Sequence, residues 1–248
     1  MRRRGKRFAN SGLMAVAKFL IQAASWCESE DPLKRARAAA ILCQLRREQV
    51  PGEPWKPGKF LYQDESYVLV SKMLARESDP RVIDSAVHAL GHVDNVAAVP
   101  QIIGFQEHPD ENVRFAVAFA LGCFPNEELS IQGLLALARD EDSDVRDWAV
   151  FGLGVQSDID SPEIREALLR CLKDPSQDVR EEAACGLAKR RDLRVLPKLS
   201  EMLDDPDFTV RVGEAANSLL GLDGKDTNEW GQAEYKTALQ AKFKPAAS

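Results

Sequence analysis

The sequence predicts an all-α protein built as a solenoid of helix pairs, and three observations support this fold. First, one motif recurs along the chain as DPRVIDSAVHALG, DENVRFAVAFALG, DSDVRDWAVFGLG and DPSQDVREEAACGLA. Second, the anchor valines of successive copies, Val82, Val113, Val145, Val179 and Val210, are separated by 31, 32, 34 and 31 residues, a period typical of stacked helical hairpins. Third, the residues four and eight positions after the anchor are apolar, which places them on one face of a helix.

Each repeat is expected to contain an A helix followed by a B helix that carries the motif. Aspartate or serine precedes each B helix, where it can cap the free backbone N–H groups and suit the helix dipole. A looser copy begins at Asp31, and in the copy that begins at Asp205 the small residues and the leucine come one residue late. The other expected helices are 13–24 and 33–47, the A helices 66–77, 96–106, 127–139, 162–173 and 193–203, and a capping helix 228–243 in which Trp230 and Tyr235 cover the last hydrophobic face.

The Asp-x-x-Val-Arg-x-x-Ala spacing followed by Ala-Leu-Gly resembles the HEAT repeat, in the bacterial variety also found in phycobilisome lyase subunits. The resemblance covers residues 13–222 and implies a right-handed superhelix of about six helix pairs. It also implies that the B helices line the concave surface. A basic arm, 1–12, precedes this solenoid, and a cap and tail, 223–248, follow it. Because such arrays serve many unrelated purposes, the resemblance leaves the function open.

Charge is distributed unevenly along the chain. The net charge is −6, yet residues 1–47 carry eleven Lys and Arg against three Asp and Glu, so the rest of the chain is strongly acidic. An acidic body does not suit a nucleic-acid backbone, which needs a track of cations. We therefore expect a neutral or basic protein or peptide as partner, with nucleic acid unlikely and no membrane partner.

The five cysteines show no Cys-x-x-Cys spacing, which favours a reducing, cytoplasmic location. The basic N-terminus leaves a cleaved signal peptide as an alternative, because an apolar stretch follows it. Lys18 interrupts that stretch, which instead has the length of a first helix. The basic arm could equally contact an acidic surface.

An insertion at 48–65 breaks the regular spacing. Pro51, Pro54 and Pro57 recur with a period of three residues, which favours a polyproline II segment. Its apolar side chains, Trp55, Phe60 and Tyr62, are candidate contacts. The segment either folds back over the flank of the solenoid or helps to clamp a ligand.

The side chains two, three and six positions after each anchor point away from the hydrophobic face, so they are expected to form the groove. These candidate binding residues are Asp84, His88, Phe115, Phe119, Asp147, Trp148, Phe151, Glu181 and Glu182. The aromatic members predict a ridge that grips an apolar or basic segment. The alternative is that they pack sideways against the neighbouring repeat and belong to the core.

The sequence also allows three catalytic interpretations. Asp84, His88 and His92 share a helix face, but a metal site needs a further ligand nearby, and we expect none. Helical-repeat iron hydroxylases carry several His-Glu pairs, which this chain lacks. Trp148, Asp147 and Arg180 could imitate the groove of a helical-repeat DNA glycosylase, although Arg146, Arg180 and Arg211 are expected to be repeat arginines that bond the loop carboxylates Asp142, Asp174 and Asp205.

The sequence therefore predicts a non-catalytic scaffold or adaptor that holds a peptide or partner protein on its concave face and needs no cofactor. The first alternative is a phycobilisome-lyase-like or chaperone-like subunit that acts on a tetrapyrrole-bearing protein. A HEAT-like DNA glycosylase is the lesser alternative.

Overall fold

The computed structural model describes residues 16–45, 60–205, 208–222, 227 and 230–243, and its secondary structure elements are all helices. The chain forms two compact units, Met1–Phe124 and Pro125–Ser248, which we describe one at a time. The basic arm and most of the insertion, including Trp55, lie outside the described residues. Within the described part, no helix is long and apolar enough to cross a lipid bilayer.

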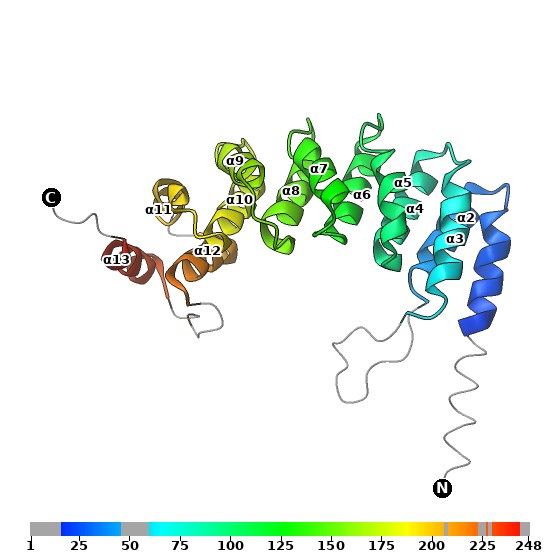
Figure 1. Ribbon diagram of the computed structural model, residues 1–248, viewed down its shortest axis with the longest axis horizontal. Coiled ribbons are helices and arrows are strands. Elements are labelled where there is room, and N and C mark those ends of the chain that lie inside the picture. Colours follow the sequence, from blue (N-terminus) through cyan, green and yellow to red (C-terminus); the bar gives the residue numbers. More distant parts are fainter. Residues whose placement is uncertain (1–15, 46–59, 206–207, 223–226, 228–229, 244–248) are drawn as a thin grey trace, which may run out of the picture. The chain divides into compact units, whose positions relative to one another are not determined.

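The N-terminal unit is a row of helix pairs, shown from dark blue to green in Figure 1. Its B helices pack side by side in chain order, α2 against α4 and α4 against α6. Helical backbone over 16–27 precedes α2 (Pro32–Leu42), α3 (Gln63–Leu74), α4 (Pro80–Val93), η1 (Val96–Ala98), α5 (Val99–Ile103) and α6 (Glu111–Gly122).

The C-terminal unit repeats this arrangement, with α8 against α10 and α10 against α12 (Figure 1). Its helices are α7 (Glu128–Leu137), α8 (Ser143–Phe151), a π-helix η2 (Gly152–Gln156), α9 (Pro162–Cys171), α10 (Gln177–Lys189), η3 (Leu193–Val195), α11 (Leu196–Met202), α12 (Val210–Leu220) and α13 (Gln232–Lys242). The predicted all-α fold of helix pairs is confirmed.

The predicted caps form where the motif begins with aspartate directly before the helix. Asp31, Asp79, Asp110 and Asp142 each accept a hydrogen bond from a backbone N–H in the first turn. The copy that begins at Asp174 differs, because its helix α10 begins after Ser176, two residues beyond that aspartate. Asp174 instead accepts from the backbone N–H of Ser176 at 2.9 Å, which leaves its carboxylate available to a neighbouring repeat.

The anchor valines of four copies are completely or almost completely buried, but Val210 of the last copy is 79% exposed. Val212 is buried in its place, and Ala215, Ala216 and Leu219 continue the buried face. The shift of the motif in the last copy therefore corresponds to a rotation of α12 about its own axis, which buries Val212 in place of Val210. Because of it, Arg211 lies on a different face of its helix from the other repeat arginines.

An arginine one position after the anchor holds the turn between the two helices of a repeat. Its guanidinium donates to two successive backbone carbonyl oxygens, which lie six and five residues earlier at 2.7–3.2 Å. Arg114, Arg146 and Arg180 do this after their anchor valines, and Arg35 does the same in the looser copy that begins at Asp31, where Lys34 stands at the anchor position. Arg180 was expected to bond a loop carboxylate, but its guanidinium instead donates to two carbonyl oxygens of the turn. These carbonyl oxygens have no partner within a helix and need a donor.

Two of these arginines also connect neighbouring repeats. Arg35 donates to both carboxylate oxygens of Glu77 at 2.6 and 3.0 Å, and Arg146 does the same to Asp174 at 2.8 and 2.9 Å. Both carboxylates lie five residues before the anchor of the following copy. Burial would raise the pKa of Asp174, but hydrogen bonds from Arg146 and the Ser176 N–H outweigh burial and lower it.

Close backbone contact joins η2 to α10. A Cβ on Gly186 would lie 2.6 Å from the Cα of Gly154 and 3.0 Å from Leu168 Cδ1. Arg190 completes this junction, because its guanidinium donates to the carbonyl oxygens of Leu153 and Gly154, both at 2.7 Å. The π-helix, which the sequence did not predict, is therefore pinned where it meets the next repeat.

The C-terminal helix α13 packs against α12. Tyr235 is 4% exposed and lies against Gly213 of α12. Its ring meets Phe208 edge-on at 6.0 Å and Trp230 at 5.3 Å. These aromatic contacts shield the last hydrophobic face.

We predict that Gly186→Ala lowers the free energy of unfolding by about 1–3 kcal/mol, because the new methyl group collides with the backbone of Gly154. Gly213→Ala is the matched control, since its Cβ would meet Tyr235 at an ordinary 3.4 Å. The control should be neutral or stabilising, because alanine favours a helix over glycine. Urea unfolding of both variants measures the difference, and equal effects would contradict the close contact.

We predict that Arg146→Ala costs about 3–5 kcal/mol, because it strands the carboxylate of Asp174, whose side chain is 10% exposed. Arg81→Ala breaks a pair whose arginine is 73% exposed and should cost less than about 1 kcal/mol. Since the pKa of Asp174 is lowered in the folded state, the pair stabilises above about pH 4 and the effect of Arg146→Ala should shrink in acid. Urea titrations at neutral and acidic pH test this, and an unchanged difference would count against it.

Candidate functional site

The predicted groove residues divide between the two units. Asp84, His88, Phe115 and Phe119 belong to the N-terminal unit, whereas Asp147, Trp148, Phe151, Glu181 and Glu182 belong to the C-terminal unit. All of them lie on B helices, as the motif requires.

In the N-terminal unit, the predicted residues form an aromatic cluster between α4 and α6. The ring of His88 lies 4.9 Å from that of Phe119 and 6.0 Å from that of Phe115, and His92 lies 5.0 Å from Phe119. Asp84 approaches His88 Nδ1 at 3.2 Å through its carboxylate. All five side chains are half-buried, so each retains some exposed surface.

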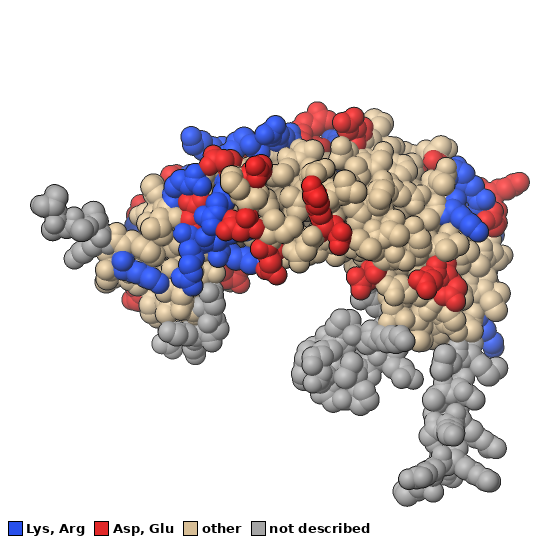
Figure 2. Space-filling view, in the orientation of Figure 1, with Lys and Arg blue, Asp and Glu red and all other residues tan. Residues whose placement is uncertain are grey.

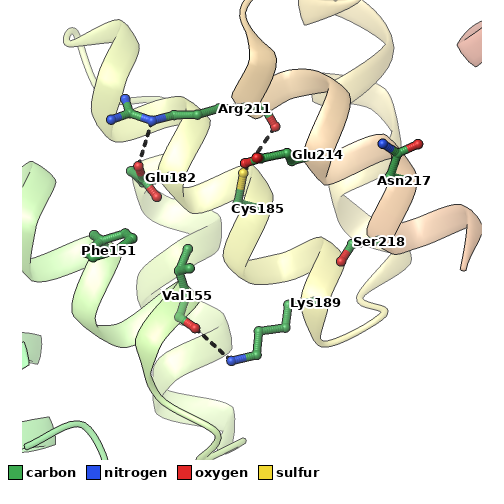
Figure 3. Close-up of a pocket in the computed structure, with 9 residues that line it drawn as sticks. All are labelled: Phe151, Val155, Glu182, Cys185, Lys189, Arg211, Glu214, Asn217 and Ser218. Carbon is green, nitrogen blue, oxygen red and sulfur yellow. Dashed lines mark hydrogen bonds and ion pairs between the residues drawn. The ribbon is translucent and has the colours of Figure 1, made fainter. Parts of the chain in front are cut away.

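In the C-terminal unit, three successive B helices surround a pocket of about 480 Å³ (Figure 3). Phe151 and Val155 line it from α8 and η2, and Glu182, Cys185 and Lys189 line it from α10. The remaining wall comes from α12 through Arg211, Glu214, Asn217 and Ser218. Trp148 meets Phe151 edge-on at 5.7 Å, so the predicted aromatic pair borders this pocket.

Glu181 and Glu182 are buried, at 3% and 5% exposure, whereas the helix pattern predicted exposed side chains. The reason is that both turn toward α12. Glu181 accepts hydrogen bonds from Gln177 Nε2 at 2.8 Å and from Thr209 Oγ1 at 2.6 Å. For Glu181 the alternative of sideways packing between repeats is therefore the observed one, while Glu182 also faces the pocket.

Arg211 is the pocket residue whose role was misjudged from the sequence. Its Nε lies 2.9 Å from Glu182 Oε1, and its Nη1 donates to Asp178 Oδ1 at 3.0 Å. The expected partner, a loop carboxylate, is replaced by two carboxylates of the preceding B helix. The signal was present in the sequence, because the late register of the last copy rotates this arginine toward α10.

Two carboxyl groups of this face have pKa values above the ordinary range. Burial raises the pKa of Glu182 to about 7, although nearby Arg211 opposes the shift. Burial likewise raises the pKa of Asp147 to about 6, and its Oδ1 is buried with no hydrogen-bond partner among the described residues. Asp178, Glu181 and Glu214 add further negative charge nearby. This face thus carries two carboxyl groups, Glu182 and Asp147, whose charge changes near neutral pH.

The chemistry of this pocket suits binding. Cys185 donates its Sγ–H to the carbonyl oxygen of Arg211 at 3.2 Å, and burial raises its pKa to about 12, so it stays a thiol. The ammonium group of Lys189 donates to the carbonyl oxygen of Val155 at 2.7 Å and to Asp158 at 3.0 Å. No group of three metal-ligating side chains is arranged for an ion in the described ranges.

Two of the predicted loop residues fall within the described part of the chain. Phe60 is half-buried, and Tyr62 caps α3 in the left-handed conformation, with φ 60°. Between them, the N–H of Leu61 donates to the carbonyl oxygen of Leu45 at 3.1 Å. The end of the insertion is therefore tied to the residues that follow α2.

We predict that Glu182→Gln stabilises the protein at pH 8 and has little effect at pH 4.5. The pKa of Glu182 is raised in the folded state, so the folded protein retains a proton that the unfolded chain releases above about pH 4. The free energy of unfolding of the wild type therefore falls as the pH rises toward 7. It should not fall in this way in the Glu182→Gln variant, because glutamine does not ionise. Thermal unfolding at both pH values measures it, with exposed Glu214→Gln as control; an equal gain from both variants would argue against the buried carboxyl.

Known proteins resemble this chain in sequence and in structure. A model of HEAT repeats matches residues 69–153 and 131–219. Protein YibA of Escherichia coli K12 is 36% identical over 119 residues, which are 48% of this chain and 41% of YibA, so the match spans less than half of that relative. YibA of strain O157:H7 matches equally.

Solved structures agree on the fold. The X-ray structure of Escherichia coli YibA has a TM-score of 0.65 at 24% identity, covering 92% of this chain and 77% of that one. An engineered protein gives 0.58 at 16% identity, covering 88% and 97%. The CpcE–CpcF complex of phycocyanin lyase from Nostoc sp. PCC7120 gives 0.43 at 16%, covering 89% and 93%, a likeness too low to bear on function. Together with the repeated helix pairs, the family match shows that this chain belongs to the HEAT-repeat proteins.

Proposed function

We propose that this protein is a non-catalytic scaffold that binds a peptide segment or domain of a partner protein on its B helices. In the C-terminal unit, the bound segment places an apolar side chain against Phe151 and basic side chains beside the surrounding carboxylates. The observation that carries this proposal is the pocket of about 480 Å³, which combines an aromatic wall with a buried carboxylate on three successive B helices.

The aromatic pair supports an apolar anchor. Phe151 and Trp148 are both half-buried, so their edge-on contact fixes the rings while part of each remains accessible. Preformed aromatic surface gains binding energy with little loss of side-chain entropy. An aliphatic or aromatic side chain of the partner would remove this surface from water.

The electrostatics support a basic partner. Asp147, Asp178, Glu182 and Glu214 surround one pocket arginine, Arg211, and its charge is already engaged by Glu182 and Asp178. Lysine or arginine side chains would find uncompensated negative charge here. Phosphate groups would be repelled, which agrees with the expectation that nucleic acid is not the partner of this face.

The aromatic cluster of the N-terminal unit is a second candidate contact on the same kind of helix. His88, Phe115 and Phe119 project from α4 and α6 and are half-buried. We also propose a cytoplasmic location, supported by the five free cysteines.

The test is a selection of short random peptides on the full-length protein, followed by affinity measurement with the enriched sequences. We expect peptides that carry lysine or arginine beside an aliphatic or aromatic residue. Phe151→Ala should weaken them about tenfold or more, the loss expected for a buried anchor. Leu193→Ala is the control, because Leu193 is 49% exposed but lies outside this pocket.

Two outcomes would reject the groove. Enriched peptides that bind Phe151→Ala as tightly as the wild type would show that another surface is used. A selection that enriches no peptide with lysine or arginine beside an apolar residue would contradict the expected partner chemistry.

A further inference from the structure

The C-terminal unit carries a basic cleft outside the groove of the B helices. Its volume is about 680 Å³, and it is bordered by the end of α7, by α8 and α9, and by the turn that follows α9. Its cations are Arg139, Arg170, Lys173 and Arg146, of which Arg146 is paired with Asp174. Its apolar surface comes from Leu169, Cys171 and Pro175. Figure 2 shows Lys and Arg side chains gathered over the end of α9.

Ion pairing within the cleft leaves three of these cations uncompensated. The carboxylate of Asp174 is engaged by Arg146 at 2.8 Å, and that of Glu166 is engaged by Arg194 at 2.6 Å. Arg139, Arg170 and Lys173 are exposed, and their side chains make no hydrogen bond or ion pair within the described part of the chain. Three positive charges therefore converge on one cleft in a unit that is otherwise acidic.

A second cleft of about 670 Å³ extends this surface toward α11 and shares Leu169 and Lys173 with the first. It adds Arg180, Arg194 and Lys198. The charges of these three are partly used, since Arg180 donates to turn carbonyls and Lys198 pairs with Glu201 at 2.7 Å. The positive surface is thus strongest in the first cleft and continues past it.

We propose that the basic cleft formed by Arg139, Arg170 and Lys173 is a second binding site, which takes an acidic segment of a protein. Carboxylates of that segment pair with the three cations, and its apolar side chains lie on Leu169 and Pro175. This site is separate from the groove and has the opposite charge, so one chain can hold a basic and an acidic partner segment together.

The lining favours an acidic peptide over a nucleic acid. No aromatic side chain lines either cleft, so neither offers a ring on which a base could stack. The side chains of Glu166, Asp174 and Glu201 divide the positive surface into separate cations, so it offers no continuous track for a phosphate backbone. Separate cations beside apolar patches instead match a peptide in which acidic and apolar residues alternate.

The test uses a fluorescein-labelled peptide of alternating glutamate and leucine, titrated with the full-length protein and followed by fluorescence anisotropy. Reversing the cleft with Arg139→Glu, Arg170→Glu and Lys173→Glu should weaken binding about tenfold or more. The matched control reverses three exposed cations of the N-terminal unit, Lys34→Glu, Arg37→Glu and Lys72→Glu, with the same change in net charge. The control should alter the affinity by less than about twofold.

Folding is checked in parallel, because basic side chains near helix ends also interact with the helix dipole. If the reversed variant unfolds, the neutral variant Arg139→Gln, Arg170→Gln and Lys173→Gln replaces it and should also weaken binding. Phe151→Ala should leave this binding unchanged, which separates the cleft from the groove.

The proposal is overturned if the control weakens binding as much as the cleft variant, since net charge alone would then explain it. A labelled oligothymidine that binds more tightly than the peptide would overturn it in favour of nucleic acid. Failure of the wild-type protein to bind the peptide would overturn it as well.

Discussion

In four of the repeats, the helix pair depends on one interaction, which is made by the arginine one position after the anchor. The turn between the two helices leaves backbone carbonyls without helical partners, and a buried guanidinium satisfies two of them at once. Arg35 and Arg146 then use their remaining N–H groups on Glu77 and Asp174 of the next repeat. One side chain thus fixes the angle within a repeat and the contact between repeats, and in the repeat of Arg146 the neighbouring Val145 fills the core.

The last repeat shows what happens when this arrangement is out of register. Val210 is exposed, Val212 fills the core, and Arg211 is turned toward α10, where it pairs with Glu182 and Asp178. An arginine that would stabilise a turn becomes part of a pocket wall. The carboxyl of Glu182 keeps a raised pKa even beside this cation, because the loss of water around it outweighs a single opposite charge. The wall of the pocket formed by Arg211 and Glu182 therefore follows from a shift in one helix.

The C-terminal unit presents opposite charges on different surfaces. Its B helices place Asp147, Glu182 and Glu214 around an aromatic pocket, while the ends of its A helices place Arg139, Arg170 and Lys173 around another cleft. A helical repeat separates such surfaces naturally, because its two helices face different sides and each contacts mainly its neighbours. Surface charge can then vary on either side without disturbing the buried seam, which suits a scaffold for partners of different charge.

The sequence by itself determined the repeat architecture, because the signals for it are local. The spacing of the valine anchors, the capping aspartates and the cap formed by Trp230 and Tyr235 all depend on short stretches of chain. The spacing of three residues within one helix also placed Trp148 beside Phe151. Only the tertiary structure decided that Glu181 is buried against Thr209, that Arg211 pairs with Glu182, and that Gly154 meets Gly186 across a π-helix. These outcomes depend on the rotation and separation of neighbouring helices, and the periodicity of a single helix does not determine either of them.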